Sequence, residues 1–185
     1  MRGLAAPLCA AALLLSACAT TAPQPDERAW TSGRLNVRID ASTASAAQSI
    51  TANFELQGTG KAGELRLNSP LGTRMATARW APGLAALTTS EGERRFDSLD
   101  ALSSSALGEA LPLAALPDWL AGRPWPGAAH ATSEAGFEQL GWQVTLTRRA
   151  EGQIEARRAA PPAVLLRVRL DEGGRGQTPT AGTSR

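Results

Sequence analysis

Apolar and polar residues alternate along several stretches of the chain, and this period of two constrains the fold more than any other feature of the sequence. Leu35, Val37 and Ile39 are the apolar members of the first such stretch, residues 33–39. The period is typical of a β-strand that buries one face. Similar strand-like patterns occupy residues 50–56, 64–67, 74–80, 84–88, 93–96, 142–146 and 164–170. Short breakers rich in Gly and Pro separate many of these stretches, so the sequence predicts an antiparallel, mainly β domain.

A segment with helical spacing interrupts the strand-like stretches. Apolar residues recur at helical spacing over about residues 99–110, and Ser98 stands where it can cap the first turn, so we expect a helix there. A second apolar stretch at residues 113–120 contains Pro117, which permits only a helix that is short or starts late. The sequence therefore predicts a curved antiparallel sheet with a helical segment inserted between two sets of strands.

The interior of such a fold can be either filled or hollow. Protein interiors are normally close packed, so the alternation by itself favours a filled core. A strongly curved sheet that is covered only by short helices can instead enclose a cavity. Composition does not decide between these two interiors.

The N-terminal residues have the pattern of a secretory signal. In residues 1–17, Arg2 precedes an apolar run that ends in small residues just before Cys18. This run is shorter than the roughly 20 residues that span a bilayer. Residues 18–29 are rich in Thr, Ala and Pro, which is typical of a flexible tether. Because Cys9 and Cys18 are the only cysteines, we expect no disulfide, thiolate metal site or cysteine nucleophile in the domain that follows.

The rest of the chain is expected to form one domain with a short tail. Residues 30–170 carry all the periodic patterns and are long enough for a real core. Residues 171–185 are polar and Gly-rich, so we expect them to be disordered. The sequence pI of about 8.9 is basic, but the arginines are interspersed with carboxylates and Lys61 is the only lysine. Nucleic-acid binding requires clustered basic residues and stacking aromatics, so we expect no nucleic-acid partner.

No pattern in the sequence predicts catalysis. Gly58, Gly60 and Gly63 fit the spacing of a dinucleotide-binding loop, but a strand-like stretch follows where the phosphate-binding helix would begin. A glycine-rich hairpin loop is the better interpretation. His130 is the only histidine and has neither a cysteine nor a second histidine with which to share a metal. We therefore expect a non-catalytic protein with no metal and no cofactor, in which His130 is a solvated loop residue.

One turn is unusual because it carries a leucine where turn tips are normally polar. Leu71 lies between Pro70 and Gly72 in this turn. Its side chain can fold back onto the core, or it can stay exposed. An exposed leucine would gain about 1.5 to 3 kcal/mol of transfer free energy on entering an apolar phase. The sequence alone leaves both alternatives open.

Several motifs together resemble the LolB family of outer-membrane lipoproteins. They run in order along most of the chain that follows the signal. They are Leu15-Ser16-Ala17-Cys18, Trp30 with Gly33-Arg34-Leu35, Ser69-Pro70-Leu71-Gly72, Pro112-Leu113 with Leu116, Trp119-Leu120 with Gly122 and Pro124, and Phe137 with Gly141-Trp142-Gln143-Val144. The first motif is similar to a lipobox, which implies cleavage before Cys18 and lipidation of that cysteine. Ala19 after it implies the outer membrane as the destination.

The resemblance implies a half-open antiparallel β-barrel covered by short α-helices, with an apolar cavity for acyl chains. It implies a lipid-anchored protein, expected to be a monomer, that faces the periplasm. This protein would accept acylated lipoprotein cargo from a periplasmic carrier of the LolA kind and insert it among outer-membrane lipids. Pro70, Leu71 and Gly72 would form the membrane-insertion loop. The residues expected to line the cavity are Leu35, Val37, Phe54, Leu56, Leu65, Leu67, Trp119, Leu120, Trp142 and Val144.

A second hypothesis belongs to another functional class. The chain can be a lipid-anchored scaffold lipoprotein of an envelope assembly complex, with a filled core. The scaffold and the receptor share the anchor and the β-rich fold, and they differ in whether the interior can take up acyl chains.

Overall fold

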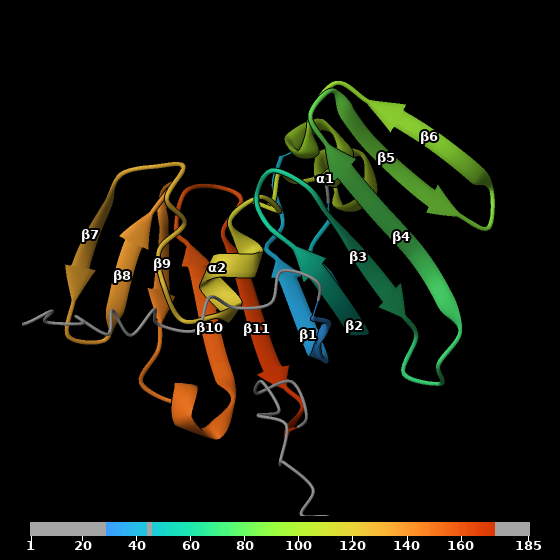
Figure 1. Ribbon diagram of the computed structural model, residues 1–185. Helices are drawn as coiled ribbons and strands as arrows, with labels where there is room; N and C mark the ends of the chain where they lie inside the picture. The colour runs from blue at the N-terminus through green and yellow to red at the C-terminus, as the bar shows by residue number, and fades with distance from the viewer. Residues whose placement is uncertain (1–28, 44–45, 173–185) are drawn as a thin grey trace, which may run out of the picture.

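An antiparallel sheet of eleven strands bends around two helices in the computed structural model, which describes residues 29–43 and 46–172 (Figure 1). The predicted signal, the lipidation site Cys18 and most of the predicted tail lie outside the described residues. The helices are α1 (Leu99–Leu107) and α2 (Leu116–Leu120), with a 3-10 turn η1 at Arg149–Glu151. The strands are β1 (Thr31–Ile39), β2 (Gln48–Gly58), β3 (Gly63–Asn68), β4 (Arg74–Ala81), β5 (Leu84–Thr89), β6 (Gly92–Phe96), β7 (His130–Ser133), β8 (Gly136–Gln139), β9 (Trp142–Thr145), β10 (Gln153–Arg158) and β11 (Val164–Leu170).

The strand order leaves the barrel open. From one edge to the other the order is β6-β5-β4-β3-β2-β1-β11-β10-β9-β8-β7, so β6 and β7 are the two edges. The first strand lies in the middle, where it pairs with β2 on one side and with the last strand, β11, on the other. This arrangement confirms the predicted half-open antiparallel barrel with short helices.

The alternation in the sequence decides which face of the sheet is buried. Val37 of β1 lies opposite Leu166 of β11, and Ile39 lies opposite Val164, and all four side chains are buried. The intervening positions face outward and are polar in β1, whereas β11 carries Leu165 and two arginines there. Both helices pack on the inner face, where they contribute Leu102 and other apolar residues to the same core (Figure 1).

Both predicted helices are present, although α1 ends three residues earlier than expected. The Ser98 side chain accepts a hydrogen bond from the backbone N–H of Ala101 at 3.1 Å, and α1 ends at Gly108 with a positive φ of 77°. Pro117 lies in the first turn of the short helix α2, where its missing N–H costs no hydrogen bond. No helix in the described part of the chain is long and apolar enough to cross a membrane.

Three strands are absent from the sequence prediction. All four residues of β7 are exposed, so β7 shows no alternation, and the predicted loop position of His130 is wrong because His130 begins this edge strand. In β8 a buried glutamine, Gln139, replaces an apolar residue in the pattern. In β10 the inward residues are Ile154 and the small Ala156, which give only a weak signal.

The glycine-rich segment is a hairpin loop, as predicted, and its glycines allow tryptophans to approach the backbone. It joins β2 to β3, with Gly58 paired to Gly63. A Cβ atom on Gly60 would lie 2.3 Å from Nε1 of Trp125. On Gly63 it would lie 2.5 Å from the Trp80 ring. Larger residues at these two positions would push the rings out of the core.

One half of the interior is filled by aromatic side chains. Trp119 of α2 packs against Phe137 and Trp142, with ring centroids 6.3 and 6.1 Å away. The Gln139 side chain, only 2% exposed, accepts hydrogen bonds from Trp119 Nε1 and from the Trp125 backbone N–H, both at 2.9 Å. It also donates to the Trp125 carbonyl at 2.7 Å. This network fixes α2 and the chain after it against β8.

We expect Gln139→Leu to destabilise the fold by about 3 kcal/mol, because the substitution leaves several buried polar groups without partners. Urea unfolding followed by tryptophan fluorescence measures the change. The control is Gln143→Leu, which replaces an exposed glutamine on the neighbouring strand β9. A loss no larger than that of the control would show that the network does not hold α2 in place.

Candidate functional site

An apolar hollow of about 80 Å³ lies in the other half of the interior, between the sheet and α1. Ser103 is the only lining residue with a polar side chain, and its hydroxyl is bonded to the backbone of Leu111, from whose N–H it accepts at 3.0 Å. The wall therefore offers no free hydrogen-bonding side chain. The lining residues are Leu35, Val37, Ile50, Leu65, Leu67, Ala76, Ala78, Leu87, Leu102, Ser103, Ala106, Leu107, Leu111, Leu113, Leu116 and Leu166.

The predicted cavity residues are divided between the two halves of the interior. Leu35, Val37, Leu65 and Leu67 line the hollow. The other six are buried but do not line it, and they are Phe54, Leu56, Trp119, Leu120, Trp142 and Val144. That any of the ten contacts acyl chains stays a prediction.

Sequence reasoning missed the residues that cover the hollow. They come from α1 and from the segment that joins it to α2, and we call residues 99–116 the cover segment. Leu102, Leu107 and Leu111 of this segment line the hollow from above the sheet. The helical spacing of leucines in this stretch was the available signal, but it indicates a buried face without saying whether that face meets a filled core or a space.

The hollow is much smaller than an acyl chain. For comparison, an apolar cavity of about 150 Å³ can bind one benzene molecule. A space of about 80 Å³ therefore holds only a few methylene groups. Uptake of a whole chain requires the cover segment to move away from the sheet.

An arginine ties the cover segment to the C-terminal strands. Arg158, at the end of β10, forms an ion pair with Glu109 of the cover segment at 2.6 Å and lies with its guanidinium 5.6 Å from the centre of the Trp142 ring. The same guanidinium donates a hydrogen bond to the carbonyl of Pro162 at 3.2 Å. Both partners of the ion pair are largely buried. This contact links the cover segment to the filled half of the interior.

The Leu71 side chain is 96% exposed at the tip of the loop between β3 and β4, so it does not fold back onto the core. The loop is held by its own hydrogen bonds, since Ser69 N–H donates to the Thr73 carbonyl and Gly72 N–H donates to the Ser69 carbonyl, both at 2.8 Å. Gly72 has a positive φ of 89°, which favours glycine. We call residues 69–73 the Leu71 loop; it presents a leucine to solvent on a closed turn.

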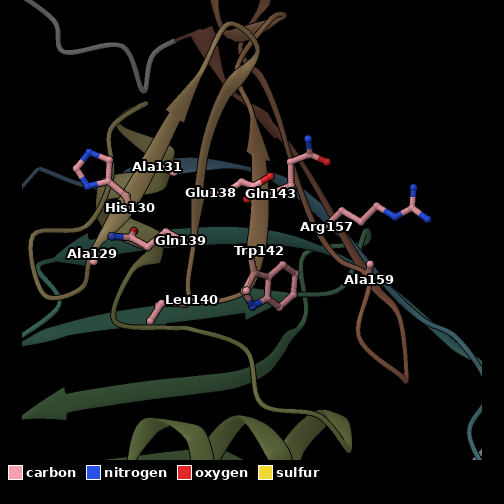
Figure 2. A pocket seen from close by; sticks show the side chains of 11 residues that line it. Ala129, His130, Ala131, Glu138, Gln139, Leu140, Trp142, Gln143, Arg157 and Ala159 are labelled. Carbon is pink, nitrogen blue, oxygen red and sulfur yellow. The ribbon is translucent and has the colours of Figure 1, made fainter.

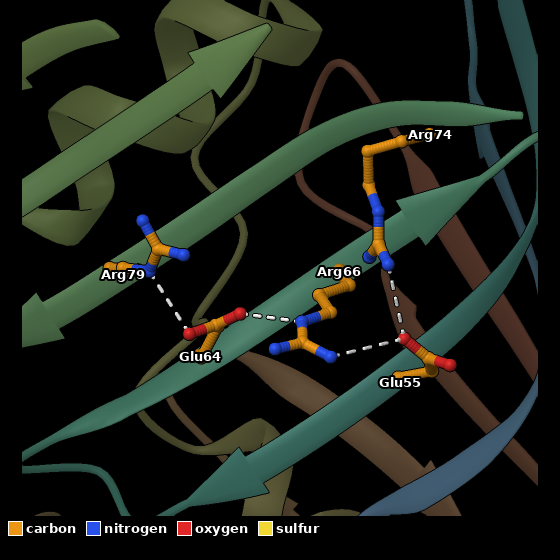
Figure 3. A network of polar contacts seen from close by, with 5 residues as sticks. All are labelled: Glu55, Glu64, Arg66, Arg74 and Arg79. Carbon is orange, nitrogen blue, oxygen red and sulfur yellow. Dashed lines mark hydrogen bonds and ion pairs between the residues drawn. The ribbon is translucent and has the colours of Figure 1, made fainter.

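Ion pairs on the outer face join the strands that carry this loop (Figure 3). Glu55 of β2 pairs with Arg74 at 3.4 Å, and Glu64 of β3 pairs with Arg79 of β4 at 3.0 Å and with Arg66 at 2.5 Å. Burial raises the pKa of the Glu64 carboxyl, but the hydrogen bonds and positive charges of the two arginines outweigh burial and lower this pKa overall. The network ties β2, β3 and β4 together next to the Leu71 loop.

A second depression, of about 580 Å³, lies over β7 to β10 and contains the only histidine. Figure 2 shows the His130 ring pointing away from Trp142 and Arg157. The His130 side chain makes no hydrogen bond or ion pair with the residues that the structure describes.

Comparisons with known proteins agree with this architecture. The family model described as "Outer membrane lipoprotein LolB" matches residues 30–171. Relatives named outer-membrane lipoprotein LolB come from Bordetella petrii, Chromobacterium violaceum and Cupriavidus pinatubonensis, and they are 34%, 31% and 32% identical over 157, 150 and 195 residues. These alignments cover 78%, 76% and 92% of this chain and 77%, 80% and 87% of the relatives. The chain belongs to the LolB family.

Proposed function

We propose that this protein is an outer-membrane-anchored receptor that accepts acylated lipoproteins from a periplasmic carrier and inserts them into the outer membrane. The observation that carries the proposal is the aliphatic hollow under the cover segment, because a hollow wall without free polar groups suits hydrocarbon chains. Membership of the LolB family supports the same function. A carrier of the LolA kind is the proposed donor of the cargo.

The physical task explains why a cavity is needed. Moving an acyl chain from lipid into water costs about 0.8 kcal/mol for each methylene group. A lipoprotein therefore cannot cross an aqueous compartment unless its chains are sheltered. The acyl chains must therefore bind more tightly in this protein than in the carrier, and less tightly than in the bilayer. Cargo then moves in one direction without nucleotide hydrolysis.

The anchor is proposed from the sequence. Cys18 would carry the acyl chains, and residues 18–29 would tether the domain on the periplasmic side of the outer membrane. The domain would then stay beside the membrane that receives the cargo. The names of the relatives place them in the same membrane.

The role in lipoprotein localisation is binding and transfer, and we propose that no chemical step accompanies it. The scaffold hypothesis is the less favoured alternative, because it requires a filled core and the half of the interior under α1 retains an unfilled apolar space of about 80 Å³. We also propose that the protein acts as a monomer.

We expect Leu71→Glu to leave cargo acceptance unchanged and to lower cargo insertion into liposomes at least about tenfold. The leucine contributes about 1.5 to 3 kcal/mol on entering the bilayer, and a carboxylate there is unfavourable. Insertion is measured by flotation of the cargo with the liposomes. The control is Leu84→Glu in the hairpin between β4 and β5, which is also exposed. Normal insertion by the Leu71 variant would show that the loop is merely structural.

We expect Ala76→Leu to fill the hollow and to lower the amount of cargo accepted from the carrier several-fold. The added methylene groups enter a space that they can occupy, so the free energy of unfolding should change by less than about 2 kcal/mol. Native mass spectrometry of the variant mixed with carrier-bound lipoprotein measures acceptance. The control is Thr77→Leu, because Thr77 is the next residue on β4 and does not line the hollow. Equal acceptance by both variants would exclude the hollow as the entry to the binding site.

A further inference from the structure

Five arginines gather on the outer face of three neighbouring strands. The register places Arg34 of β1 opposite Arg169 of β11, and Leu165 of β11 between Arg38 and Arg157. Arg167 lies between Leu165 and Arg169 along β11, and its side chain is on the same face. We call this group the basic face, and its members are Arg34, Arg38, Arg157, Arg167 and Arg169. These arginines are scattered in the sequence, and the sheet brings them together on one face. The clustering is local, because the formal net charge of the whole chain is only +2.

Most of the positive charge on the basic face is not neutralised. One glutamate, Glu155, shares the face and pairs with Arg167 at 2.9 Å, while Arg38 pairs with Asp40 at its margin at 3.3 Å. The guanidinium groups of Arg34 and Arg169 make no hydrogen bond or ion pair with the described residues. Like charges directly opposite each other on neighbouring strands destabilise a sheet. Sheet stability therefore does not explain why two arginines lie opposite each other here.

Arg34 and Arg169 also line a surface depression of about 680 Å³. Two carboxylates, Glu55 and Asp171, also line it. The Glu55 charge is offset by ion pairs with Arg66 and Arg74, whereas Asp171 keeps its charge and accepts a hydrogen bond from the neutral Ser32 hydroxyl at 2.8 Å. Glu172 is a further carboxylate in its wall. The other polar lining groups include the amides of Asn53 and Asn68. Free guanidinium groups beside amide donors are suited to phosphate oxygens.

The depression adjoins the Leu71 loop. Arg34 lies opposite Asn53 in the sheet, and Asn53 lies opposite Asn68, the last residue before the loop. The Asn53 side chain donates a hydrogen bond to the carbonyl of Ser69, the first residue of the loop, at 3.4 Å. The unneutralised arginines are therefore connected through the sheet to the base of the loop that presents the exposed leucine.

We propose that the basic face binds the phosphate headgroups of anionic phospholipids, with Arg34 and Arg169 as the principal contacts. The proposal rests on the proposed function and adds the kind of lipid surface to which the receptor delivers its cargo. The charge complementarity is between a row of arginines and a negatively charged membrane surface. An arginine close to such a surface raises membrane binding by roughly fivefold at ordinary salt, and the effect falls off within about 10 Å.

The test compares vesicle binding of two double variants. The chain of residues 18–185 with Cys18→Ser is used, so that no acyl anchor contributes. Co-sedimentation is measured with phosphatidylcholine vesicles that contain or lack phosphatidylglycerol. We expect Arg34→Gln/Arg169→Gln to lower binding to the phosphatidylglycerol vesicles at least about tenfold and to leave binding to pure phosphatidylcholine unchanged. High salt should abolish the difference. The unfolding midpoint of the Arg34→Gln/Arg169→Gln variant should not fall, because the substitutions remove the repulsion between two arginines that lie opposite each other.

The matched control is Arg94→Gln/Arg95→Gln on the edge strand β6, which removes the same charge from exposed residues away from the basic face. Equal loss in both variants would overturn the proposal, because only the net charge would then matter. Competition by inorganic phosphate at millimolar concentration would also overturn it, in favour of a site for small anions. A loss of cargo acceptance in the absence of vesicles would assign the face to protein docking. Normal vesicle binding by the Arg34→Gln/Arg169→Gln variant would refute this inference. If Leu71→Glu still impairs insertion in that case, the proposed function stays intact.

Discussion

The unequal filling of the interior is the constraint on which the rest of the structure depends. Aromatic rings and the Gln139 network fill the half under α2, so that half gives the open sheet a rigid, close-packed support. The half under α1 is lined by aliphatic side chains and retains a hollow. Because α1 packs over apolar surface that is not completely filled, its attachment is weaker than that of a helix on a close-packed core. No strand pairs join β6 to β7, so the sheet is open at the edge strand β6, which α1 contacts.

We propose that the affinity gradient that drives transfer has the same origin. A hollow of about 80 Å³ must be widened before it holds an acyl chain, and the work of widening it would reduce the affinity for cargo. This work would allow a cavity whose walls are almost wholly apolar to release its cargo to a bilayer. The contact between Arg158 and Glu109 adds to the work, since it ties the cover segment to the strands next to Trp142. The Leu71 loop lies on strands that are joined to one another by ion pairs, so it can contact a membrane while the cover segment moves.

Local sequence patterns predicted the parts of the fold that repeat, and they failed where the fold depends on distant contacts. The alternation of Leu35, Val37 and Ile39 identified a central strand, and Ser98 identified the start of α1. The strand β8 was missed because Gln139 is buried through its bonds to two tryptophans, which no local pattern reveals. Four of the ten predicted cavity residues line the hollow, because alternation specifies an inward side chain without specifying which half of the interior receives it. The basic face could not be predicted either, since only the pairing of β1 with β11 brings Arg34 and Arg169 together.

The central claim is that acyl chains of the cargo lie between the cover segment and the sheet. Isotope-filtered NMR of the protein with a bound triacylated lipopeptide measures this contact through nuclear Overhauser effects from the acyl methylene groups. The account predicts such effects to the methyl groups of Leu65 and Leu102, which line the hollow, and none to Val144 in the filled half. Effects confined to Val144 or to the outer face of the sheet, with Leu65 and Leu102 silent, would contradict it.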